Sequence, residues 1–90
     1  MRQATISAMR EKLAALEPLA LEILDESHKH AGHAGARDGG GHFHMTIVSP
    51  RFAGLRTMER QRLVYDALGS MMKNEIHALS MDAKSPEETA

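Results

Sequence analysis

The chain of 90 residues contains two segments in which apolar side chains recur at spacings of three and four. This spacing is typical of a helix that buries one face. The first segment predicts a helix over residues 5–16, which ends before Pro18. The second predicts a helix that runs to about Leu68 or beyond, with Thr57 as its N-cap and Gly69 near its end.

Other segments alternate between apolar and polar side chains with a period of two, as half-buried strands do. The alternation is clear in residues 42–50, which Pro50 ends, and it recurs in residues 19–27, where Glu22 lies opposite the apolar face. The residues that define these apolar faces are Phe43, Met45 and Ile47 in one segment and Leu19, Leu21 and Ile23 in the other.

A third segment with a period of two, residues 75–83, contains an isolated histidine. The alternation predicts that His77 shares one strand face with Leu79 and Met81. A histidine among apolar neighbours loses hydration unless it lies near a sheet edge or has a partner. A structural role for His77 and a role as a ligand are therefore both open.

The last residues, 84–90, contain the start of a helix, because "SPEE" has the capping-box form with Ser85 as the cap. The resulting order is helix, strand, strand, helix, strand, helix start. This order predicts one two-layer α+β domain over residues 1–90, with helices covering one face of a small sheet. Residues 33–41 are expected to form a flexible Gly-rich loop between paired strands, longer than the usual 2–5 residues.

The composition limits the classes of function that this chain can have. Without cysteine it can form neither a disulfide framework nor a thiolate metal site of its own. We expect a cytoplasmic protein with no membrane partner, because the chain has neither a long apolar run nor a signal-peptide pattern. An enzyme is not expected, since a cysteine nucleophile and the motifs GxSxG, GxGxxG, HExxH and the P-loop are all absent.

Five of the six histidines lie in the Gly-rich stretch of residues 26–45. Three interpretations are open: a soluble loop, a metal-binding tract, and a loop that carries one or two histidines to a site shared with another molecule. Imidazole is a common ligand of transition metals. A zinc site built only from these histidines is disfavoured, because a mobile loop has no fixed geometry and no acidic or thiolate ligand lies at a recognisable spacing.

The motifs "VSPRFAG", "RQRLVYDAL" and "IHALSM", together with "DESHKHAGH" and "HFHMTIVS", resemble the BolA family in the same order. The resemblance covers about residues 5–88. Gln61 departs from it, since the family usually has histidine between the two arginines of the second motif. The resemblance implies a KH-like fold of the second topological class, with the order α-β-β-α-β-α and a three-stranded mixed sheet.

The resemblance also implies a heterodimer with a monothiol glutaredoxin, in which the two proteins share a bridging [2Fe–2S] cluster and act in iron–sulfur trafficking or iron-linked regulation. It implies His77 as one ligand and His30 as the loop ligand, with His33 as its rival. The partner's cysteine and a glutathione thiol would supply the sulfur ligands. No cofactor is expected to bind the isolated chain tightly, and a weak homodimer is compatible with the resemblance.

A second function implied by the resemblance is that of a nucleic-acid-binding transcriptional regulator. Four arginines in residues 51–62 face only one carboxylate, Glu59, in the same stretch. They could contact phosphates or form a solvated face that docks an acidic partner. The net charge of −1 and the absence of a GxxG loop argue against nucleic acid. The candidate contacts are Arg51, Arg56, Arg60 and Arg62.

Overall fold

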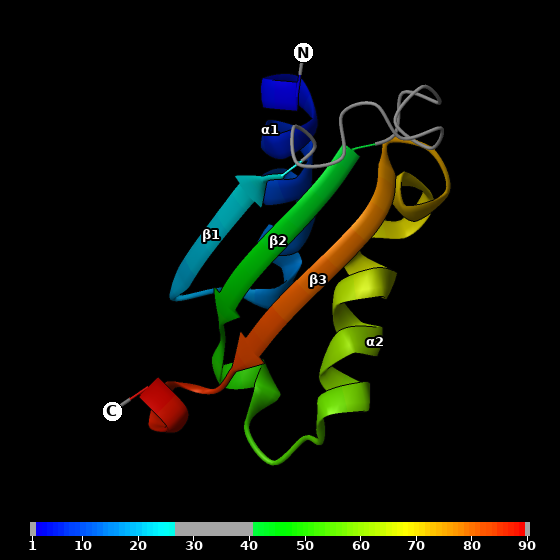
Figure 1. The fold of residues 1–90 in the computed structure, drawn as a ribbon. Helices are drawn as coiled ribbons and strands as arrows, with labels where there is room; N and C mark the ends of the chain where they lie inside the picture. Colours follow the sequence, from blue (N-terminus) through cyan, green and yellow to red (C-terminus); the bar gives the residue numbers. More distant parts are fainter. Residues whose placement is uncertain (1, 27–40, 90) are drawn as a thin grey trace.

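The computed structural model describes residues 2–26 and 41–89. Their regular elements follow the predicted order (Figure 1). None of the described helices has the length and apolarity that crossing a membrane requires. The helices and strands are α1 (Arg2–Leu13), β1 (Ala20–Asp25), β2 (Gly41–Val48), α2 (Thr57–Leu68) and β3 (Ile76–Lys84), with short 3₁₀ helices at Ala14–Leu16, Pro50–Phe52, Gly69–Lys73 and Pro86–Thr89.

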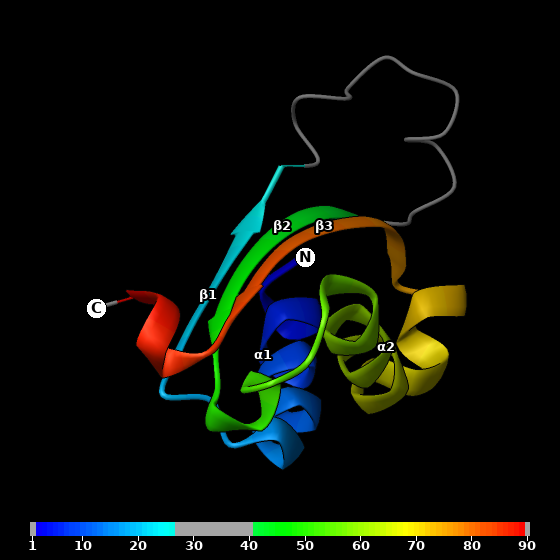
Figure 2. The same cartoon turned by 90° about the horizontal axis from the view of Figure 1, so that it is seen from below.

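The three strands form one mixed sheet in the order β1-β2-β3. β1 is antiparallel to β2, and β2 is parallel to β3. A parallel pair needs a long crossover connection, which α2 provides here. Both long helices cover the same face of the sheet, and no described element covers the other (Figure 2). The predicted α+β class and the three-stranded mixed sheet with helices on one face are confirmed.

The core lies between the helices and the covered face of the sheet. In β2 the burial alternates without a break, so Phe43, Met45 and Ile47 all point into the core as predicted. β1 departs from its prediction at one end. Ile23 is buried, but Leu19 is 68% exposed, because it lies before the strand begins and the pleat does not direct its side chain.

The segment "VSPRFAG" joins β2 to the helical layer. The Ser49 hydroxyl is buried; it donates a hydrogen bond to the Leu16 carbonyl (2.5 Å) and accepts one from the Arg51 backbone N–H (3.1 Å). Phe52 is fully buried in the core. Gly54 has φ 78°, a left-handed conformation that glycine adopts most readily. This segment therefore has a structural role in the described part of the chain.

The ends of α2 are defined by side chains and by one glycine. Thr57 was expected to be the N-cap but is the first helical residue; Arg56 precedes the helix, and its backbone N–H donates to the Glu59 carboxylate (2.8 Å). The prediction was off by one residue: Arg56 is the last residue in an extended conformation, and the Glu59 carboxylate of the first turn accepts its N–H. Gly69 ends the helix with φ 57°, as predicted.

Candidate functional site

The ladder between β2 and β3 contains a β-bulge at the end where β3 begins. Gly41 pairs with Ile76, but the next residue, His42, pairs with Ala78. His77 is therefore an extra residue between two regular pairs. A bulge of this kind redirects a side chain relative to regular alternation, and we name this end of the sheet, which contains His42 and His77, the histidine end.

The bulge changes the face on which His77 lies. Leu79 and Met81 pack against the core, as regular alternation predicts, and Ile76 is also buried, with 2% of its surface exposed. His77 is exposed. The prediction that His77 shares a face with Leu79 and Met81 was wrong, because the extra residue shifts the alternation by one position.

Two other histidines lie on the face of the sheet that no described helix covers. His42 and His44 alternate with the buried residues of β2. The rings of His42 and His77 lie side by side, with their centroids 5.0 Å apart and their planes tilted by 42°. A hydrogen bond of 2.7 Å joins His44 Nδ1 to Ser80 Oγ, one row further along the sheet. The tertiary structure thus brings His42 and His77 together, whereas His44 bonds Ser80.

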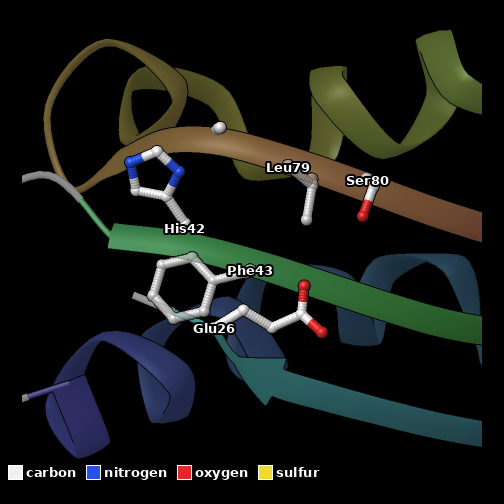
Figure 3. Close-up of a pocket in the computed structure, with 6 residues that line it drawn as sticks. Glu26, His42, Phe43, Leu79 and Ser80 are labelled. Carbon is white, nitrogen blue, oxygen red and sulfur yellow. The ribbon is translucent and has the colours of Figure 1, made fainter. Parts of the chain in front are cut away.

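An open hollow of about 230 Å³ lies beside the histidine end (Figure 3). It is too open to enclose a small molecule, but it gives access to the sheet next to His42. No group of three or more potential metal-binding side chains occurs within residues 2–26 and 41–89. The hollow is lined by Glu26, His42, Phe43, Ala78, Leu79 and Ser80.

The candidate loop ligands, His30 and His33, lie outside the described residues. The described residues on either side of them are both held at the histidine end. The Glu26 backbone N–H donates to the His42 carbonyl (2.7 Å), and the Gly41 N–H donates to the Glu75 carbonyl (2.9 Å). The two described residues that flank positions 27–40 therefore lie next to His42 and the start of β3.

The four candidate arginines do not form one group of equivalent cations. Arg60 is largely buried, with 11% of its side chain exposed, and is bound within the chain. Its guanidinium donates to the carbonyls of Leu55 and Ala83 (both 2.9 Å) and to both oxygens of Glu88 (2.5 and 3.2 Å). Arg60 therefore fastens α2 to the end of β3 and to the C-terminal turn.

Arg51, Arg56 and Arg62 are exposed. Arg51 forms an ion pair of 2.9 Å with Glu17, in which both side chains are more than half exposed. An exposed pair of this kind adds little to stability, about 0–1 kcal/mol. These three arginines are thus the members of the predicted set that stay accessible to a partner.

The contact between Arg60 and Glu88 predicts a specific acid response. Hydrogen bonds from the Arg60 guanidinium, and next from the Ser85 backbone, lower the pKa of Glu88 from 4.5 to about 2. A carboxyl group with a lower pKa in the folded state stabilises the fold above the unfolded value, and this stabilisation is lost as pH falls from 4.5 toward 2.

We expect Glu88→Gln to unfold more easily than the wild type at neutral pH. The difference between the two proteins should shrink as pH falls through this range, because the substituted amide does not titrate whereas the native carboxylate becomes protonated. Urea unfolding at several pH values measures this difference in the free energy of unfolding. The control is Glu87→Gln, which alters the adjacent exposed carboxylate. A constant difference at every pH would contradict the assigned contact.

Comparison with known proteins shows which family this chain belongs to. The family model described as BolA-like protein matches residues 13–88. The chain is 46% identical over 86 residues to SufE-like protein 1, chloroplastic/mitochondrial, of Arabidopsis thaliana, covering 89% of this chain and 23% of that protein. It is 46% identical over 87 residues to Protein BOLA1, chloroplastic, of the same plant, covering 92% and 54%. The chain thus spans little more than half, or less, of these relatives.

A bacterial relative and a solved structure extend the comparison. The chain is 37% identical over 81 residues to the DNA-binding transcriptional regulator BolA of Escherichia coli (strain K12), covering 89% of this chain and 74% of that protein. The structure of BolA1 from Arabidopsis thaliana superposes with a TM-score of 0.77 at 41% identity, covering 93% of this chain and 94% of that one. The chain, with its bulged third strand and exposed His77, therefore belongs to the BolA-like protein family.

Proposed function

We propose that this chain is a non-enzymatic partner of a monothiol glutaredoxin and that His77 ligates a bridging [2Fe–2S] cluster shared by the two proteins. The observation that carries the proposal is the exposed imidazole of His77, which the bulge turns away from the core. A ligand for a cluster held between two proteins must be open to the partner. Regular strand alternation would have directed this ring into the core instead.

The donor set of the chain fits a shared cluster better than a resident one. Each iron of such a cluster needs two ligands besides the bridging sulfides, and imidazoles on one iron raise its reduction potential. The chain has no cysteine, so in this proposal its cluster ligands are imidazoles. In this proposal the sulfur ligands come from the partner and glutathione, and the shared cluster serves iron–sulfur trafficking or iron-linked regulation.

The second ligand in this proposal is His30, with His33 as the rival. Glu26 is held at the histidine end through its hydrogen bond to His42. His30 is four residues further along the chain, and four residues span at most about 14 Å. His33 is seven residues from Glu26 and has a longer reach, so variants of each are needed to separate the two.

Reconstitution of the cluster tests the proposal. The chain, a monothiol glutaredoxin, glutathione, iron and sulfide are expected to give an absorption and circular dichroism spectrum that differs from that of the glutaredoxin homodimer. His77→Ala should return the spectrum to that of the homodimer, because one iron loses its ligand. His44→Ala is the matched control, since His44 lies on the same sheet face but bonds Ser80, and it should keep the heterodimer spectrum.

The outcomes separate the ligands. A heterodimer spectrum that His77→Ala leaves unchanged would rule out the assignment of this residue. Between His30→Ala and His33→Ala, the variant that alters the spectrum identifies the loop ligand. The cytoplasmic location stays a prediction, because two relatives have names that refer to chloroplasts or mitochondria.

A second candidate function is DNA binding, favoured by the name of the bacterial relative and by the three exposed arginines at positions 51, 56 and 62. Arg60 is engaged within the chain and does not join them. Three phosphate contacts give a slope of about −2.7 for the logarithm of affinity against that of salt concentration. A titration of duplex DNA at two salt concentrations tests this, and no binding at low salt would remove this candidate.

A further inference from the structure

We infer that His42 and His77 together form a binding site for a single divalent transition-metal ion, such as Zn²⁺ or Cu²⁺, in the free chain. The two imidazoles come from neighbouring strands and lie side by side at the histidine end. Imidazole nitrogen is a preferred ligand of both ions. This site requires neither the loop histidines nor a partner protein.

The spacing of the two rings suits one shared ion. A histidine nitrogen lies about 2.0–2.1 Å from zinc, which puts the ring centroid about 3.2 Å from the metal, and two such ligands at a near-tetrahedral angle have centroids about 5 Å apart. The observed separation of the His42 and His77 centroids is 5.0 Å. The rings are also tilted by 42° rather than stacked face to face, and rotation about the side-chain torsions would turn one nitrogen of each ring toward a common ion.

The backbone fixes the pair before a metal binds. His42 lies in the central strand, and its carbonyl accepts the Glu26 N–H. His77 is held in the bulge between the buried Ile76 and Ala78, which pairs with His42. Two residues in paired strands have a backbone geometry that the sheet fixes. Little backbone entropy is therefore lost when they bind an ion.

Each imidazole has two ring nitrogens, so one can ligate the metal while the other keeps a hydrogen bond, as is usual for ligating histidines. Within residues 2–26 and 41–89 the pair has no third side chain that would complete a metal site. Water or an added ligand would fill the remaining positions. A site with two protein ligands resembles an open, exchangeable site more than a structural zinc site, which has four.

The ion site goes beyond the proposed cluster ligation but shares His77 with it. One imidazole nitrogen cannot ligate two metals at once. An ion bound between His42 and His77 should therefore hinder cluster sharing, and removing it with a chelator should restore that sharing.

The test uses the full chain in which the loop histidines are removed by H28A, H30A and H33A, so that only the strand histidines remain. Zn²⁺ is titrated near neutral pH by calorimetry, and Cu²⁺ binding is followed by electron paramagnetic resonance. We expect one ion per chain and a spectrum with nitrogen ligands. Adding either H42A or H77A should weaken binding at least about tenfold, and adding H44A should change it less than about twofold.

Circular dichroism and thermal unfolding of each variant confirm that the fold is kept. If the variant without loop histidines binds no ion, or if H42A, H77A and H44A all weaken binding equally, the assignment of the pair is wrong. The mixture contains no glutaredoxin, iron or sulfide. Failure of this site is therefore distinguishable from failure of the proposed cluster ligation, which is measured without added zinc or copper.

Discussion

Replacing Phe52 by alanine is expected to lower the free energy of unfolding by about 3–5 kcal/mol. Phe52 has 0% of its surface exposed and belongs to the core cluster. Its removal both loses buried apolar surface and leaves a cavity, because a close-packed core relaxes only in part. A domain of this size has a total stability of about 9 kcal/mol, at roughly 0.1 kcal/mol per residue. The variant should therefore keep about half of it.

Urea unfolding followed by far-UV circular dichroism measures this loss, with the slope of the transition checked for constancy. Met58→Ala is the matched control: Met58 is 74% exposed on α2, and its removal should change the stability by less than about 0.5 kcal/mol. Equal losses for the two variants would show that Phe52 does not occupy the core position described.

Replacing Ser49 by alanine should cost about 1–3 kcal/mol, the second largest effect that we expect on stability. The hydroxyl is buried, donates to the Leu16 carbonyl and serves as acceptor for the Arg51 N–H. Alanine would leave both backbone groups without this partner in a region closed to water. The volume lost is small, so the effect would come from the hydrogen bonds and not from a cavity.

The same urea experiment tests this prediction, with Ser70→Ala as the control because Ser70 is exposed. The Ser49 variant should unfold at a clearly lower urea concentration, whereas the Ser70 variant should stay near the wild type. A Ser49 variant that is as stable as the control would show that water or a rearranged backbone replaces both hydrogen bonds.

The motifs that carry the family resemblance divide into two physical roles. "VSPRFAG" is structural, since Ser49 and Phe52 are buried and Gly54 supplies a left-handed turn. "IHALSM" combines both roles: Ile76 is buried in the core, whereas the bulge leaves His77 exposed and accessible to a ligand. The cluster and ion-site proposals therefore concentrate on the histidine end of the sheet, while "VSPRFAG" maintains the fold.

The amino-acid sequence alone predicted the type and order of the long helices and the strands of the described chain, since the periods of 3.6 and 2 are local properties of a helix and a strand. The alternation in β2 placed all three of its core residues correctly. Gly69 and Ser85 marked helical ends because capping also depends on residues only a few positions apart. The start of α2 differs by one residue from its prediction, because Arg56 precedes the helix and the Glu59 carboxylate accepts its N–H.

The tertiary structure alone decided which face His77 occupies and which arginine is unavailable to a partner. The bulge depends on how β3 is matched to β2, a strand far earlier in the chain, and no local pattern records that register. Arg60 meets Ala83 and Glu88 because the end of β3 and the C-terminal turn lie next to α2. Both features arise from contacts between distant segments, so the pairing of His42 with His77 became visible only in the folded chain.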